Sequence, residues 1–241
     1  MDKTGGYAVT GFATTRWSVI LQARQPDTAR GALEAICGAY RAPVLTYLYR
    51  QGYTKHDAED LAQEFFAHLL ERRWDMRAEP ARGRFRSFLL TALQHFTIDA
   101  RLRAGAQKRG GHQRRLTDEG AIDLLAAPES ESPEQAFDRA WARTVIERCH
   151  ARLDAEARLA GKQALYARLR GYIAEPGDPA DYRRLGEELG MRPNTIAVSV
   201  HRLRARLREL VREELADTIQ TEDDLRAELH DLRAALGQAT H

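Results

Sequence analysis

Apolar side chains recur at spacings of three and four residues along almost the whole chain, whereas alternating polar and apolar runs are essentially absent. The first pattern places side chains on one face of an α-helix, and the second is typical of strands. We therefore expect an all-α protein. The pattern predicts helices near residue 15, over 29–50, 54–70 and 86–103, in the part from 137 to 215, and over 221–236.

Stretches rich in glycine, proline and polar residues interrupt these helices. Pro80 and Gly83 lie in a predicted loop, and residues 106–136 contain three glycines, two prolines and many carboxylates, which is typical of an extended linker. We expect two small helical domains, over residues 12–105 and 137–215, joined by a flexible acidic linker over 106–136. Residues 216–241 then form a helical C-terminal extension.

The helix predicted over 54–70 has one apolar stripe and one acidic stripe. Its inward residues are Leu61, Phe65, Phe66 and Leu69. Its outward carboxylates, which we name the acidic ridge, are Asp57, Glu59, Asp60 and Glu64. Thr54 and Asp57 have the spacing of a capping box, so some of this charge stabilises the helix itself. The alternative is that the ridge docks on a basic surface of a partner protein.

Charge is distributed in blocks, although the formal net charge is only +2. Residues 101–115 carry basic side chains without an acid, residues 116–136 carry acids without a base, and residues 192–212 are again rich in arginine. Such segregation indicates separate electrostatic tasks. Cys37 and Cys149 lie far apart in apolar contexts and are expected to be reduced core thiols. Without a signal sequence or a run of membrane-spanning length, we expect a cytoplasmic protein and no membrane partner.

Residues 181–210 have the pattern of a helix-turn-helix. Gly190 permits a left-handed turn, and Pro193 suits the first turn of the second helix. The outward face of that helix carries short polar groups first and arginines later: Asn194, Thr195, Ser199, Arg202 and Arg206. This order suits a recognition helix that reads bases near its start and meets phosphates further along. The alternative is a surface helix in which arginine serves only helicity and solubility.

Three segments in this order resemble bacterial RNA polymerase sigma factors of the sigma-70 family, in the extracytoplasmic-function group. They are AEDLAQEFF at 58–66, FRSFLLTALQHFTIDARLR at 85–103 and LGMRPNTIAVSVHRLRARL at 189–207. The resemblance implies a helical bundle like sigma region 2, a helix-turn-helix like sigma region 4, and a function in promoter recognition, DNA melting and transcription initiation. It implies core RNA polymerase, through its β′ clamp helices and β subunit, and promoter DNA as partners.

The same resemblance assigns roles to residues. It places core polymerase binding on Asp57, Glu59, Asp60, Gln63 and Glu64. It places binding of the −10 element, including capture of a flipped base, on Arg84, Arg86, His95, Arg101 and Arg103. It places binding of the −35 element on the five outward residues of the second helix-turn-helix helix. The acidic linker would then thread through a basic channel of the polymerase.

The chain departs from the family pattern in several places. His95 stands where many members carry Asn, Arg192 where a Ser or Thr cap is usual, and Ala197 where a basic residue is common. Ala62 occupies the position of a kinase-controlled threonine in some relatives, which leaves Thr54 as a candidate for a Ser/Thr kinase. An anti-sigma factor is the other candidate regulator. For the C-terminal extension, one hypothesis is a regulatory cover that folds back over one domain.

Two rival functions remain open at this point. Asp60, Glu64 and His68 share a helix face and could begin a metal site. A di-metal bundle requires Glu-x-x-His on each of two paired helices, however, and the sequence offers no such pair. We therefore expect no metal, no cofactor and no enzymatic activity. The other rival is a stand-alone helix-turn-helix transcriptional regulator, which would bind duplex DNA as a dimer without the polymerase.

Overall fold

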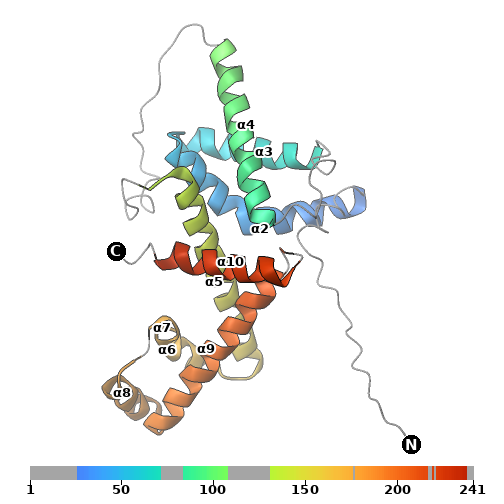
Figure 1. The fold of residues 1–241 in the computed structure, drawn as a ribbon. Coiled ribbons are helices and arrows are strands. Elements are labelled where there is room, and N and C mark those ends of the chain that lie inside the picture. Colours follow the sequence, from blue (N-terminus) through green and yellow to red (C-terminus); the bar gives the residue numbers. More distant parts are fainter. Residues whose placement is uncertain are drawn as a thin grey trace, which may run out of the picture.

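The structure, a computed structural model, describes residues 26–71, 84–107, 131–175, 177–216, 219 and 221–237. These residues form helices joined by turns and contain no strand, so the prediction of an all-α protein is confirmed (Figure 1). The helix expected near residue 15, the loop before Arg84 and most of the acidic linker lie outside the described residues.

The first three helices agree with the predicted ones to within a few residues. They are α2 (Pro26–Arg50), α3 (Lys55–Glu71) and α4 (Phe85–Gln107). A tight turn joins α2 to α3, and Gly52 adopts a φ of +88° there, which favours glycine. The C-terminal end of α4 projects away from the other helices (Figure 1).

Helix α5 (Pro133–Leu159) begins with a capping box in which Ser132 and Gln135 satisfy each other's backbone amides. The helix therefore starts three residues before the expected end of the linker at residue 136. Glu131, expected in that solvated linker, instead accepts hydrogen bonds from Arg50 of α2 and Arg139 of α5. This pair of contacts ties α5 to α2 at its first turn.

The main apolar core is shared by both predicted domains. Buried side chains of α2, α3 and α4 pack in one cluster with those of α5, α9 and α10, including Phe65, Leu93, Phe137, Trp141, Leu210 and Leu232. The predicted domain boundary at residue 137 falls inside α5, whose first half packs on α2 (Figure 1). The two predicted domains are thus in direct contact in this structure.

Helices α6 (Gln163–Leu169), α7 (Gly171–Ala174), α8 (Pro179–Leu189) and α9 (Pro193–Ala216) follow. A second, smaller core holds the helix-turn-helix together through Leu169, Leu185, Ile196 and Val200. Gly190 ends α8 with a φ of +64°, which confirms the predicted left-handed turn. Helix α8 begins at Pro179, two residues before the predicted start of the helix-turn-helix at residue 181, because Asp178 and Asp181 form a capping box.

The last helix, α10 (Glu222–Gly237), confirms the helix predicted in the C-terminal extension. Thr221 and Asp224, which have the spacing of a capping box, cap it, with the Asp224 amide donating to Thr221 Oγ1 at 3.1 Å. Helix α10 lies across α5 and also contacts α9 (Figure 1). Leu225, Leu229, Leu232 and Leu236 form an apolar stripe along α10, in which the first three face the core and Leu236 is exposed.

Candidate functional site

The acidic ridge lies on the exposed side of α3. The opposite side of α3 is buried and consists of Ala58, Ala62, Phe65, Phe66 and Leu69. The ring centroids of Phe65 and of Phe96 in α4 lie 5.5 Å apart. Because these aromatic contacts fix the rotation of α3, the carboxylates must point outward. The structure thus presents Asp57, Asp60, Gln63 and Glu64 to solvent, with Glu59 partly exposed.

The members of the ridge differ in how far they are engaged. Asp57 shares two hydrogen bonds with Thr54, which confirms the capping interpretation for this residue. Glu59 lies 3.8 Å from Arg41, and Glu64 accepts from Arg103 of α4 at 2.9 Å. Asp60 has only the exposed His56, at 3.6 Å, beside it. Gln63 has no recorded partner among the described residues. Asp60 and Gln63 are therefore the most readily available to a partner.

The basic residues of α4 fall into two groups. His95 near the middle of the helix, and Arg101 and Arg103 in its C-terminal half, are exposed. Arg101 lies over the ring of Tyr53, and Arg103 lies over Phe96. Leu102 beside them is 68% exposed. This half of α4 offers cations and apolar side chains together, the combination that suits a single strand with stacked bases.

The N-terminal pair of arginines on α4 is placed differently. Arg86 is 5% exposed, and its guanidinium lies 4.4 Å from the ring centroid of Trp141 of α5. Three carboxylates surround it, and we name them the acidic socket: Asp138 of α5, and Glu228 and Asp231 of α10. Arg84 also pairs with Asp231. In this arrangement both arginines are engaged by protein carboxylates.

The socket changes the ionisation of its members. Burial raises the pKa of Glu228 above its ordinary value of 4.5, against the lowering effect of Arg86 and Arg84. Burial likewise raises the pKa of Asp138, and again Arg86 opposes the shift. The three carboxylates outnumber the two guanidiniums, so the site carries excess negative charge when all are ionised.

The predicted recognition helix is the N-terminal half of α9. Asn194 and Thr195 are exposed at its start, and Ser199 donates to the carbonyl of Thr195 at 2.8 Å. Arg202 is exposed, and the described residues offer it no hydrogen-bonding or charged partner. These four residues are open to a ligand.

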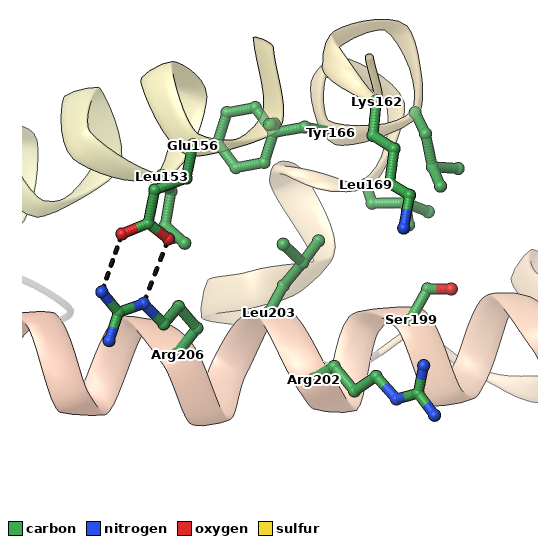
Figure 2. A pocket seen from close by; sticks show the side chains of 11 residues that line it. Leu153, Glu156, Lys162, Tyr166, Leu169, Ser199, Arg202, Leu203 and Arg206 are labelled. Atoms are coloured by element: carbon green, nitrogen blue, oxygen red, sulfur yellow. Dashed lines mark hydrogen bonds and ion pairs between the residues drawn. The ribbon is translucent and has the colours of Figure 1, made fainter. Parts of the chain in front are cut away.

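Arg206 is engaged by other residues of the protein. It donates two hydrogen bonds to Glu156 of α5, at 2.7 and 3.0 Å (Figure 2). It donates further hydrogen bonds to Glu209 and Glu213. A hollow of about 260 Å³ lies beside this pair, between α9 and the helices α5 and α6. Leu153, Leu169 and Leu203 line it, and Lys162 and Arg202 stand at its edge (Figure 2).

Sequence patterns missed the acidic socket and the partner of Arg206. One signal was present, since Glu228 and Asp231 flank Leu229 and Leu232 of the apolar stripe. A carboxylate so close to a buried stripe needs a cationic partner. The pattern does not say which of the many arginines of the chain supplies it.

Other kinds of site find no support in the part of the chain that the structure covers. Within it, no three side chains of His, Cys, Asp or Glu gather as a metal site would require. No described helix combines the length and the apolar character needed to cross a membrane.

The described chain is all-α, with an exposed acidic ridge on α3, exposed cations on α4 and a helix-turn-helix. Residues 37–107 match the family model for Sigma-70 region 2. This range includes α3 with the acidic ridge and all of α4. The match supports a sigma factor role in transcription initiation, with core RNA polymerase and promoter DNA as the implied partners. No curated protein and no solved structure matches the chain.

Proposed function

We propose that this protein is an RNA polymerase sigma factor of the extracytoplasmic-function type. It binds core polymerase, recognises the −10 and −35 promoter elements and directs melting and initiation in the cytoplasm. The observation that carries the proposal is the exposed acidic ridge within the range that matches Sigma-70 region 2, followed along the chain by a helix-turn-helix.

The ridge is the proposed contact with the polymerase clamp. Asp60 and Gln63 supply its most available part, and Glu59 and Glu64 add charge at its borders. Asp57 contributes less, because it caps α3. A row of carboxylates on a rigid helix complements a basic partner surface and steers association.

The proposed DNA contacts are divided between two helices. His95, Arg101 and Arg103 of α4 would hold the melted −10 strand. The start of α9, with Asn194, Thr195, Ser199 and Arg202, would enter the major groove at the −35 element. Arg84, Arg86, Arg103 and Arg206 have carboxylate partners in this structure, and each contacts DNA at full strength only after exchanging them.

Transcription reconstituted with bacterial core polymerase on genomic DNA tests the proposal. We expect promoter-specific transcripts that core alone does not make, and capture of core by the protein. Asp60→Arg should abolish both without loss of helicity. Glu147→Arg, an exposed change of equal charge on α5, is the control and should leave both intact. No transcripts and no capture with the wild-type chain would refute the proposal, and equal activity of the two variants would refute the role of the ridge.

A further inference from the structure

The acidic socket connects the part of the chain that matches Sigma-70 region 2 to a part that lies outside the match. Arg84 and Arg86 lie within the range 37–107, whereas all three socket carboxylates lie outside it. Arg86 Nε donates to Glu228 Oε2 at 3.1 Å, and Arg86 Nη2 donates to Asp231 Oδ2 at 2.6 Å. The start of α4 is therefore held by residues of α5 and α10.

Helix α10 makes two kinds of contact: apolar packing on α5 and α9, and ion pairs with Arg84 and Arg86. It packs on α5 and α9 with apolar side chains, among them Leu232, which is buried in the main core. Its recorded polar contacts with α4 are the ion pairs of Arg84 and Arg86. Apolar packing does not depend on the partners of those arginines, so α10 can stay on α5 and α9 when the ion pairs break.

The ion pairs are poorly suited to be a purely structural clamp. Glu228 is completely buried, and its Oε1 atom has no hydrogen-bond partner among the described residues. Desolvation of buried charges offsets much of their mutual attraction, and an unsatisfied carboxylate oxygen adds a further cost. A rival set of anions could therefore displace the socket at moderate cost.

DNA phosphates are such a rival. A guanidinium binds carboxylate and phosphate with the same fork of N–H groups, so it cannot serve both at full strength at one time. Arg86 uses Nε and both terminal nitrogens on the socket. Few donors are left over for nucleic acid.

We propose that α10 and the acidic socket form an intramolecular latch that withholds Arg84 and Arg86 of α4 from promoter DNA. The inference rests on the proposed function and extends it to regulation. Latch release breaks the ion pairs of Arg84 and Arg86 with the socket and lets the two arginines contact phosphates instead. The apparent DNA affinity is then the affinity of the open state multiplied by the fraction of molecules that are open.

Asp231→Lys tests the latch, because it sets a like charge against both arginines at a partly exposed position. Asp223→Lys is the matched control, since it makes the same charge change on α10 at a site that is 91% exposed and pairs only with Arg226 among the described residues. We expect Asp231→Lys to raise promoter-DNA affinity in the presence of core by about three- to tenfold over Asp223→Lys. Equal affinities of the two variants would overturn the latch.

Amide hydrogen exchange on the full chain reports the latch without any polymerase. In Asp231→Lys, amides at the start of α4 and in α10 should exchange faster, while those of α3 keep their protection. Unchanged exchange in α4 and α10 would overturn the latch even where the protein is active. If Asp231→Lys exchanges faster everywhere, Asp231→Asn against Asp223→Asn repeats the comparison with a milder change.

The two proposals fail in different ways. A chain that shows no transcription and no core capture in any variant refutes the sigma factor function, whereas exchange still decides whether α10 holds α4. Transcription that is present and identical in Asp231→Lys and Asp223→Lys refutes the latch alone.

Discussion

Arg86 of α4 and Glu228 of α10, 142 positions apart in the sequence, form a buried ion pair with Nε and Oε2 at 3.1 Å. Arg86 belongs to the helix proposed to hold the −10 strand, and Glu228 belongs to the C-terminal extension. The pair thus connects the proposed DNA-binding surface to a segment for which the sequence suggested only a hypothetical covering role.

The socket carboxylates should make the fold more stable as the pH falls from neutrality toward 4.5. Burial raises the pKa values of Glu228 and Asp138 above their ordinary values, so the folded chain holds their protons more tightly than the unfolded chain does. Proton uptake therefore favours the folded state in the window above 4.5. The free energy of unfolding in urea, measured between pH 7 and 4.5, reports this effect. Glu228→Gln, which removes one titrating group, should show a weaker dependence; an equal slope in both proteins would contradict the prediction.

Glu131→Gln should weaken the junction of α2 and α5 and lower the free energy of unfolding by about 1–3 kcal/mol at neutral pH. Burial works to raise the pKa of Glu131, but Arg139 and Arg50 outweigh it and lower the pKa below 4.5. The ionised group stabilises the fold above the unfolded-state pKa, and this contribution is lost as pH falls through the lower folded-state value. The free energies of unfolding of the wild type and the variant, measured in urea, should converge below pH 4.5. A constant difference would argue against the assignment.

Gly186→Ala should destabilise the helix-turn-helix by about 1–3 kcal/mol. A Cβ atom at Gly186 would lie 2.6 Å from the carbonyl oxygen of Met191, a backbone atom that cannot move aside cheaply. Gly38→Ala is the control, because it adds a methyl group to open space in α2 and should gain up to about 1 kcal/mol in helix propensity. Thermal or urea unfolding measures the stability of the two variants relative to the wild type. A Gly186→Ala protein as stable as wild type would count against this packing.

Arg202→Ala should weaken binding to the −35 element more than Arg206→Ala does. Arg202 is free among the described residues, whereas Arg206 is held by Glu156 through two hydrogen bonds. Loss of one phosphate contact should reduce the slope of log affinity against log salt by about 1 for Arg202→Ala. Titrations of the polymerase-bound protein with −35 duplex over a range of salt measure this slope. Equal losses would show that Arg206 leaves Glu156 on binding.

Leu232→Ala should loosen α10, because Leu232 is 4% exposed and belongs to the main core. Truncation of a buried leucine costs about 2–5 kcal/mol, and in a terminal helix the loss appears as faster local exchange. Leu236→Ala, at a position that is 36% exposed, is the matched control and should change little. Similar exchange of α10 in both variants would contradict the observed packing.

Local features of this protein were determined by the sequence alone. Thr54 with Asp57, Thr221 with Asp224, and Gly190 each act within one helix turn, so their caps and the left-handed turn follow from residue type and spacing. The outward direction of the acidic ridge follows equally from the apolar stripe beside it. The match of residues 37–107 to Sigma-70 region 2 agrees with these short-range signals.

The partners of individual charges were decided only by the tertiary structure. Arg86 and Arg101 look alike as cations on one predicted helix, yet Arg86 is buried against α5 and α10, while Arg101 is exposed. Arg206 pairs with Glu156 for the same reason, because α9 packs on α5. Ion pairs across helices depend on how the apolar faces dock, and periodicity along one helix carries no information about which distant carboxylate will arrive opposite a given arginine.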